Sequence, residues 1–358
     1  MMKPVVFIAF TLNQSSVSDY FTALSNKFHF EDYHVVVFTK KQNDIKNLNT
    51  AIEICFWPSK RPTTIKDFWF AYKKMKHYKP VMAVSIFGSV NVFVLAGYLS
   101  KVRYRIAWVR TLSTQFVNQS RLLIFRKSLV YKLANQIIAN SNATKEDVQS
   151  TYKVKGNKIK VLPNSVKNYN LYNNADYEDN KIIYVGRLHS SKGVDVLIKA
   201  VSELVNQNFD IHLDIIGTGI EKDNLSELTN KLNLSERIHF LGGKSKPEVL
   251  SAFKTSYCAV IPSRSEAFGF TVIEAMSVGT CVIGANNTGI KEIIINNQTG
   301  LLFETDNYQD LAAKIKSILI DEKYRNELAN NGFERFLSHY ETESVINRDF
   351  EYFSKLIK

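Results

Sequence analysis

Two glutamates eight positions apart flank a stretch that is suited to binding a phosphate. Glu266 lies in a polar loop after the apolar, strand-like run 259–261, and Glu274 lies about one turn into a predicted helix over residues 270–278. The first amides of a helix carry roughly half a positive charge, which favours an anion. Gly269 allows a ligand to approach the backbone closely. A ligand with a phosphate in its middle and hydroxyls at both ends, such as a nucleotide sugar, fits this pattern.

A pattern this short also arises without any function. In that alternative interpretation Glu274 only complements the helix dipole and Glu266 is a solvated loop charge. The neighbouring residues favour a ligand site, because residues 262–279 resemble the Glu-x7-Glu signature of retaining glycosyltransferases of the GT-B fold, glycosyltransferase family 4 in particular, with Ser277 in place of the usual alanine. The runs 281–285, 288–292 and 297–303 resemble the family's continuation.

A second loop places two basic side chains where they could hold a diphosphate. The predicted strand 181–185 is followed by Gly186-Arg187-Leu-His-Ser-Ser-Lys192-Gly193. Arginine binds phosphate oxygens through a planar fork, and lysine binds them as a point charge. Two basic loop residues alone are usually solvated, but this run resembles the family's G-R-L-x-x-x-K-G loop, which binds the diphosphate of the donor.

Glycines follow two further predicted strands. Gly217 and Gly219 come after residues 211–216, and Gly243 comes after residues 238–241. The Gly217-x-Gly219 pair lacks the third glycine of a dinucleotide fingerprint, so a tight turn explains it better than a site for NAD. We expect these turns to line the donor.

The expected chemistry follows from the charge that the reaction creates. Breaking the bond between an anomeric carbon and a nucleoside diphosphate leaves negative charge on the diphosphate, which either a metal or fixed cations and N–H dipoles can stabilise. The sequence contains no Asp-x-Asp pair to hold a metal at a diphosphate. Arg187, Lys192 and the amides of residues 268–270 could act instead, so we expect neither a metal nor a cofactor.

The resemblance implies how the reaction proceeds. It implies retention of the anomeric configuration, with the leaving phosphate accepting the proton of the acceptor hydroxyl. It also implies that Glu266 binds hydroxyls of the donor sugar and that Glu274 binds the ribose. The expected catalytic residues are therefore Arg187, Lys192 and Glu266.

The N-terminal half departs from the family pattern at two places. The loop after the first predicted strand has no glycine, and there Ser15 or Ser16 could offer a hydroxyl to the donor phosphate or could cap the next helix. Arg110 stands after the predicted strand 105–109, where many relatives have a histidine. It could reach the donor or an anionic acceptor, or only join a basic face. The complete set of expected donor-binding positions is Glu274, Phe268, Gly269, Phe270, Thr271, Gly186, Gly217, Gly243, Ser16 and Arg110.

Strand-like and helix-like runs alternate along the whole chain of 358 residues, which is too long for one ordinary domain. Such alternation predicts doubly wound parallel sheets. We expect an α/β protein with two Rossmann-like domains facing across a cleft, the GT-B fold. The expected boundaries are 1–166 plus 341–358 for the N-terminal domain, 167–180 for a linker rich in Asn, Tyr and Asp, and 181–340 for the nucleotide-sugar domain.

Charge is spread unevenly over the chain. The net charge is +12, with +17 in residues 1–166 and −5 in the remainder, and no acidic residue occurs between Asp67 and Glu146. Such a half suits an anionic surface, either nucleic acid or anionic lipid, although a generally lysine-rich protein is an alternative. The basic and aromatic residues considered for membrane docking are Lys60, Arg61, Lys66, Lys73, Lys74, Lys76, Lys79, Phe68, Trp69, Phe70 and Tyr72.

The sequence also bears on the compartment. The apolar start 5–10 is too short for a signal peptide, and the later apolar run 92–99 is far shorter than the ~20 residues of a membrane span. Cys55, Cys258 and Cys281 form no metal or redox pattern and are expected to be buried thiols. We therefore expect a cytoplasmic protein, peripheral on the inner face of the cell membrane.

The resulting hypothesis is transfer of a hexose from a nucleotide sugar, with UDP-sugar favoured over GDP-sugar, to a glycan acceptor. We expect the acceptor to be lipid-linked, in the synthesis of a surface polysaccharide or lipopolysaccharide, and we expect no nucleic-acid partner. Sugar phosphorylases and nucleotide-sugar epimerases share the fold and are alternatives, although no lysine site for pyridoxal phosphate is evident. A nucleic-acid-binding protein would explain the basic half but not Glu266, Glu274, Arg187 and Lys192.

Overall fold

The computed structural model describes residues 3–13, 15–40, 47–115, 120–169 and 178–357. The chain forms two compact units. The N-terminal unit comprises Met1–Ser165 and Thr342–Lys358, and the C-terminal unit comprises Val166–Glu341. The last segment of the chain therefore belongs to the first unit.

The N-terminal unit is built on a seven-stranded sheet of order β3-β2-β1-β4-β5-β6-β7 in which all neighbours are parallel. Its strands are β1 (Val5–Ala9), β2 (His34–Thr39), β3 (Glu53–Phe56), β4 (Met82–Ile86), β5 (Tyr104–Val109), β6 (Gln136–Ala139) and β7 (Ile159–Val161). Its α-helices are α1 (Ser16–Phe30), α2 (Ile65–Tyr78), α3 (Val90–Leu99), α4 (Arg121–Leu133), α5 (Asn142–Tyr152) and α13 (Thr342–Ile357).

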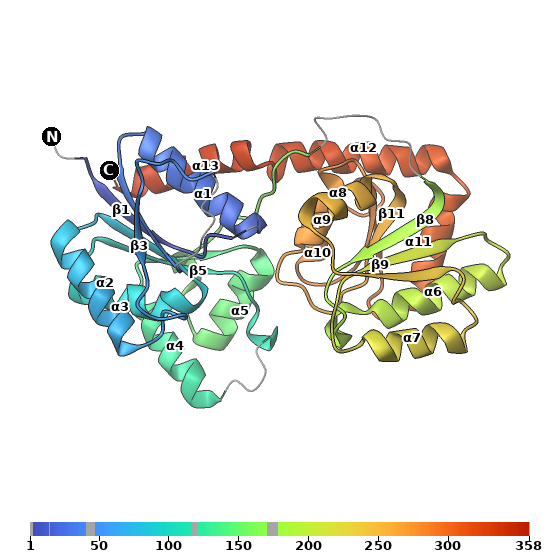
Figure 1. The fold of residues 1–358 in the computed structure, drawn as a ribbon, viewed down its shortest axis with the longest axis horizontal. Coiled ribbons are helices and arrows are strands. Elements are labelled where there is room, and N and C mark those ends of the chain that lie inside the picture. Colours follow the sequence, from blue (N-terminus) through green and yellow to red (C-terminus); the bar gives the residue numbers. More distant parts are fainter. Residues whose placement is uncertain (1–2, 14, 41–46, 116–119, 170–177, 358) are drawn as a thin grey trace. The chain divides into compact units, whose positions relative to one another are not determined.

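Helices cover both faces of this sheet, as parallel sheets require. Side chains of α1 and α13 share one core with strand residues, and side chains of α2 to α5 pack in cores on the other face. In Figure 1, α1 and α13 lie above the sheet and α2 to α5 lie below it. The buried hydroxyl of Tyr20 on α1 donates to Asp349 on α13 over 2.7 Å, which ties the end of the chain to its beginning.

The C-terminal unit repeats the plan with a six-stranded parallel sheet of order β10-β9-β8-β11-β12-β13. Its strands are β8 (Glu178–Val185), β9 (His212–Ile216), β10 (Ile238–Gly242), β11 (Ser256–Ile261), β12 (Cys281–Ala285) and β13 (Leu301–Phe303). Its α-helices are α6 (Val194–Asn206), α7 (Lys222–Lys231), α8 (Lys246–Lys254), α9 (Phe270–Met276), α10 (Ile290–Ile293), α11 (Tyr308–Leu319) and α12 (Glu322–His339). Two buried apolar clusters form its core, one on each face of the sheet.

The predicted α/β class with two Rossmann-like parallel sheets is confirmed. One boundary of the expected linker is wrong, since β8 begins at Glu178 and not at residue 181. The polar run reads as a loop by composition, but the backbone amide of Glu178 donates to the carbonyl of Thr255 and continues the sheet. Residues 170–177 of the expected linker lie outside the described residues.

Among the described residues no helix is long and apolar enough to cross a membrane. All three cysteines are buried thiols, as expected. In each sheet the strand order reverses once, between β1 and β4 and between β8 and β11. Ligands of open parallel sheets bind at the carboxyl ends of the strands beside such a reversal. These two positions are where a site is expected in each unit.

Candidate active site

The two loops with the predicted donor residues leave adjacent strands of the C-terminal sheet. Residues 186–193 follow β8 and residues 262–269 follow β11, and these strands pair directly. The backbone amide of Arg264 donates to the carbonyl of Ser191 over 2.9 Å. A Cβ atom at Gly193 would lie 2.1 Å from the carbonyl oxygen of Pro262, so only glycine lets the loops approach this closely. The backbone thus joins the two motifs into one site.

An ion pair links the loops at their centre. Lys192 Nζ lies 2.5 Å from Glu266 Oε2, and the two side chains are 16% and 20% exposed. The backbone carbonyl of Glu266 accepts hydrogen bonds from the Thr288 hydroxyl at 2.8 Å and from the Gly289 amide at 3.0 Å. The loop after β12 therefore fixes the backbone of Glu266, while its carboxylate faces a lysine from the loop after β8.

The loops after β8 and β9 are stacked through their backbones. A Cβ atom at Gly217 would lie 1.8 Å from the carbonyl oxygen of Gly186, and the Leu188 amide donates to the Thr218 carbonyl over 2.9 Å. The next loop joins them, because the Gly217 amide donates to the Gly242 carbonyl over 2.8 Å. Thr218 also lies beside Gly243. Gly186, Gly217 and Gly243 thus lie in successive loops along one edge of the sheet.

Arg187 projects from this stack as an exposed side chain. Its backbone carbonyl accepts a hydrogen bond from the Tyr184 hydroxyl over 2.9 Å. Burial raises the pKa of Tyr184, the negative charge of Glu266 raises it further, and the positive charge of Arg187 opposes the shift. The phenol therefore stays a donor that fixes the Arg187 backbone, while the guanidinium remains accessible.

Glu274 has a lysine partner of its own. Lys246, the first residue of α8, places its Nζ atom 2.5 Å from Glu274 Oε1 and 5.7 Å from the ring centre of Tyr169. The Glu274 side chain is 14% exposed. In this structure each of the two predicted carboxylates is thus paired with an ammonium group.

The helix that carries Glu274 begins at Phe270, with Gly269 as its N-cap residue at φ +110°. Phe268 and Gly269 are buried, and Phe270 and Thr271 are half-buried. The Phe268 ring packs against Phe270 and Tyr340, with centroids 5.7 and 5.9 Å away. Its side chain belongs to the core, so only its backbone can contribute to ligand binding.

Two predicted donor residues belong to the N-terminal unit. Ser15 is the N-cap of α1 and accepts a hydrogen bond from the Ser18 amide, and Ser16 is the first residue of the helix. Arg110 is buried after β5, donates to Asn164 and lies 5.6 Å from the ring centre of Phe21. Burial lowers the pKa of Arg110 to about 10, and the group remains charged at neutral pH.

Sequence reasoning missed two basic residues that organise the site. One is Lys246, described above. The other is Arg264, which donates to the carbonyl of Ser190, to both carboxylate oxygens of Asp195 at 2.9 and 2.8 Å, and to Asp306 at 2.5 Å. The available signal was its position within the run 262–279, two residues before Glu266.

Within the described ranges no cluster of three or more His, Cys, Asp or Glu side chains could hold a metal ion. Among the described residues the site contains the cations Arg187, Lys192, Lys246 and Arg264, and the last three lie against carboxylates. Such groups can stabilise negative charge that forms on a bound diphosphate. The carboxylates can accept hydrogen bonds from hydroxyl groups.

Family models match both units. "Glycosyl transferases group 1" matches residues 170–335, and "Glycosyltransferase Family 4" matches residues 17–167. The two matches together cover most of the chain, which belongs to the family-4-like glycosyltransferases of the GT-B fold.

Two curated relatives illustrate the range of the family. The capsular polysaccharide biosynthesis glycosyltransferase CapM of Staphylococcus aureus is 27% identical over 70% of this chain and 70% of its own length. The N-acetylgalactosamine-N,N'-diacetylbacillosaminyl-diphospho-undecaprenol 4-alpha-N-acetylgalactosaminyltransferase of Campylobacter jejuni is 31% identical over 58% of this chain and 56% of its own. The chain spans little more than half the length of several curated relatives, including two uncharacterised glycosyltransferases of Methanocaldococcus jannaschii at 54% and 57%.

A solved structure agrees over nearly the full chain. The Anabaena protein HepE in complex with UDP superimposes with a TM-score of 0.81, covering 98% of this chain and 100% of its own at 17% identity. At this identity the likeness establishes the fold.

Proposed function

We propose that this protein transfers a hexose from a nucleoside-diphosphate sugar to a glycan acceptor carried on a lipid, with retention of the anomeric configuration. The observation that carries the proposal is the Lys192–Glu266 ion pair at the carboxyl ends of β8 and β11, with Arg187 exposed on the same loop as Lys192. A phosphate-sized ligand entering this site meets two cations and, next to them, a carboxylate that can bind sugar hydroxyls.

The roles follow from the charges. Arg187 and Lys192 stabilise the diphosphate as the bond from the anomeric carbon to the phosphate oxygen breaks. The acceptor hydroxyl attacks from the same face, and its proton passes to the departing phosphate oxygen. Glu266 binds hydroxyls of the donor sugar, and Glu274 binds those of the ribose. The reaction needs no metal in this proposal, because fixed cations stabilise the leaving group.

Binding of the donor changes the partners of both carboxylates. A ribose that donates to Glu274 competes with Lys246, and a diphosphate that attracts Lys192 draws it from Glu266. Both lysines have four rotatable side-chain bonds and can turn to a new partner. The two ion pairs thus hold both carboxylates in place in this structure.

A UDP-sugar is the favoured donor, supported by the fold shared with the Anabaena protein that was solved with UDP. A lipid-linked acceptor is supported by the diphospho-undecaprenol in the name of the Campylobacter relative.

The N-terminal unit offers room for the acceptor at the carboxyl edge of its own sheet. One cavity of about 290 Å³ is lined by Arg110, Thr111, Asn91 and Lys127 among others. A second cavity of about 450 Å³ is lined by Thr11, Lys40, Arg61 and Ser89 among others. Both include Phe87. These basic walls suit an acceptor that carries phosphate.

Titration with UDP, GDP and ADP, each followed by calorimetry, tests the donor site directly. We expect UDP to bind and Arg187→Ala to weaken it, while Lys231→Ala, which removes an exposed lysine of α7, leaves it unchanged. NMR of the glycoside formed from a UDP-hexose would give the anomeric configuration. No binding of any nucleoside diphosphate, or an inverted product, would contradict the proposal.

A further inference from the structure

The outer face of the layer formed by α2, α3 and α4 exposes an unusual number of large apolar side chains. On α4 these are Leu122, Leu123, Phe125 and Leu129, with Leu122 73% and Phe125 61% exposed. On α3 they are Leu95, Tyr98 and Leu99, and on α2 they are Ile65 and Trp69. We call these nine side chains the apolar helix face. Large exposed apolar surfaces mark interaction sites.

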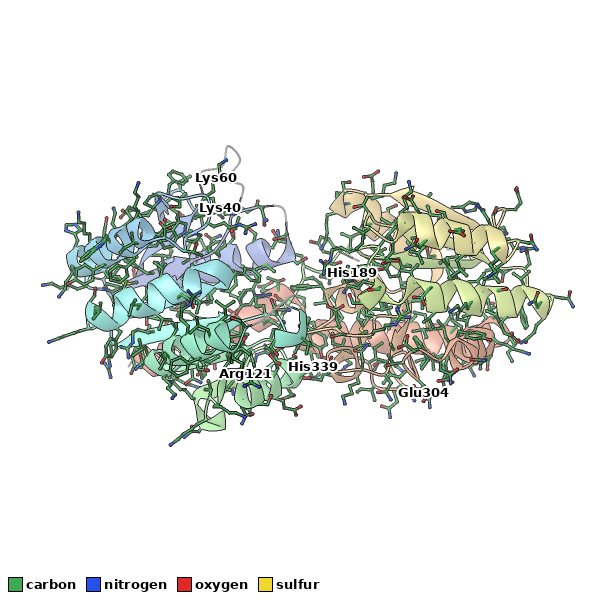
Figure 2. The ribbon with its side chains drawn as sticks, turned by 90° about the horizontal axis from the view of Figure 1, so that it is seen from below. Lys40, Lys60, Arg121, His189, Glu304 and His339 are labelled. Atoms are coloured by element: carbon green, nitrogen blue, oxygen red, sulfur yellow. The ribbon has the colours of Figure 1, made fainter. Side chains whose placement is uncertain are left out.

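The three helices are neighbours, so their exposed residues share one side of the N-terminal unit. Helix α3 contacts both α2 and α4. Figure 2 shows the layer from its outer side, with Arg121 labelled at the start of α4. Residues 95, 98 and 99 follow helical spacing, and α3 contains no charged residue. The exposed stripe of α3 is therefore apolar or aromatic throughout.

Positive charges surround this face. The exposed basic residues on the outer helices are Lys66, Lys73 and Lys76 of α2 and Arg121, Arg126 and Lys132 of α4. Lys101 and Arg103 are exposed directly after α3. Asp67 is buried in the capping box at the start of α2, and the next acidic residue along the chain is Glu146. The apolar helix face thus has basic surroundings, and the described residues of its own three helices include no exposed acidic side chain.

This face differs from the group of aromatic residues, 68–70 and 72, that the sequence alone suggests for membrane docking. Phe68, Phe70 and Tyr72 of α2 pack against the core, and of that group only Trp69 is exposed. The largest apolar contribution comes instead from α4, whose sequence RLLIFRKSLVYKL combines leucines with arginine and lysine.

From this arrangement we infer that the apolar helix face docks on an anionic lipid bilayer, with the exposed apolar side chains of α2, α3 and α4 in the headgroup region and the basic residues against lipid phosphates. The inference deepens the proposed function and rests on it for its purpose, since a lipid-linked acceptor is found at such a surface. Leucine and phenylalanine beside lysine and arginine are the composition of helices that lie in a bilayer interface. Clustered lysine and arginine add attraction to anionic lipid.

Other occupants fit the face less well. Two copies of this chain meeting through it would bring like charges together without acidic partners. Nucleic acid interfaces are polar and make little use of exposed leucine. A bilayer satisfies both properties at once, because its interior takes the apolar side chains and its headgroups neutralise the basic ones.

Intrinsic fluorescence gives a direct test with the unmodified protein. Of the three tryptophans, Trp69 is 51% exposed while Trp57 and Trp108 are 8% and 2% exposed. Phosphatidylglycerol vesicles should therefore shift the Trp69 emission to the blue, and the shift should be absent in Trp69→Phe. Vesicles of phosphatidylcholine alone should give a much smaller shift.

Vesicle co-sedimentation separates the apolar from the electrostatic contribution. The pair Leu122→Ser and Phe125→Ser, and separately the pair Arg121→Glu and Arg126→Glu, should each lower binding by about tenfold or more. Phe30→Ser is the matched apolar control, since Phe30 is 70% exposed on α1 at the opposite face of the sheet, and Lys231→Glu in the C-terminal unit is the charge control. Both controls should bind as the unmodified protein does.

Absence of vesicle binding, or equal binding of all variants, would overturn the inference. So would a dimer that dissociates when Leu122 and Phe125 are changed, since the face would then belong to a second copy. UDP binding without vesicle binding would overturn the docking inference and leave the proposed function intact. Vesicle binding without nucleotide binding would support the docking inference and contradict the proposed function.

Discussion

The ammonium nitrogen of Lys192 lies 2.5 Å from a carboxylate oxygen of Glu266, although 74 positions of sequence separate the two residues. The parallel pairing of β8 with β11 brings them together, because both residues follow the carboxyl end of their strand. The pair therefore places a cation and a carboxylate together at one edge of the sheet. Cations fixed at such a position can stabilise a leaving group that becomes negative.

Loss of a donor contact should reduce turnover far more than stability. We expect Arg187→Ala and Glu274→Ala each to lower the rate at saturating donor by about a hundredfold or more, since one charge-assisted contact to the leaving group is worth roughly 2–4 kcal/mol in the transition state. Glu227→Ala, an exposed glutamate of α7, is the matched control. Retention of more than about half of the original turnover by either variant would show that the site is assigned wrongly.

The role of fixed cations predicts the response to metal removal. Because Arg187 and Lys192 are proposed to stabilise the leaving diphosphate, activity should persist when EDTA removes divalent ions. The measurement is the initial rate of glycoside formation with and without chelator. A complete loss that Mg²⁺ or Mn²⁺ restores would contradict this mechanism.

The network around Arg264 should make the free energy of unfolding depend on pH below about 3.8, the ordinary pKa of the Asp195 carboxyl. Burial raises the pKa of Asp195, but hydrogen bonds and charge from Arg264 outweigh it, so the pKa lies below its ordinary value of 3.8. An acid whose pKa is lowered by folding stabilises the folded state above its unfolded pKa and loses that effect as the pH falls through the folded pKa.

Asp195→Asn should therefore lower the free energy of unfolding at pH 7 by about 1 kcal/mol or more, as expected for charge-assisted hydrogen bonds. The difference from the unmodified protein should shrink as the pH falls below 3.8, the ordinary pKa of the carboxyl. Urea unfolding at pH 7 and near pH 3 measures both quantities. A difference that stays constant across this range would exclude the ionised Asp195 as its source.

Phe87 carries backbone strain at the wall of both N-terminal cavities. Its φ is +51°, and its side chain is 54% exposed. A left-handed backbone costs a non-glycine residue about 1–2 kcal/mol, and such positions cluster at binding sites. Phe87→Gly should therefore be more stable than Phe87→Ala by about 1 kcal/mol, as measured by thermal unfolding.

The same two variants test the role of the ring. If Phe87 contacts the acceptor, both should raise the acceptor KM and leave UDP binding unchanged. If the acceptor KM is unchanged in both variants, Phe87 has no role in acceptor binding.

The sequence predicts the parts of this protein that depend on local patterns. Lys192 and Glu266 stand next to strand-like runs, and the parallel sheet that alternation predicts brings their loops together. Lys246 could not be paired with Glu274 in this way, because nothing in the local pattern of α8 marks the contact. The contacts of Arg264 with Asp195 and Asp306 could not be predicted for the same reason.

The sequence gives no clear helix signal for residues 121–133, which form α4. Leucines and basic residues alternate there without forming one apolar and one polar side, so helical periodicity is weak. The prediction that the linker extends to residue 180 rests on the polar composition of residues 178–180, and strand pairing overrides that composition. The structure of both segments is decided by their neighbours.

The return of α13 to the first unit makes the C-terminal unit an insertion within the N-terminal one. A fragment that stops at Ser165 would lose Val345, Ile346 and Phe353 from a core that they share with α1. Residues 166–341, in contrast, form a continuous segment with two buried clusters of their own. The C-terminal unit can therefore be produced, or exchanged between relatives, as one continuous segment, whereas the N-terminal unit requires two separate pieces of the gene to be kept together.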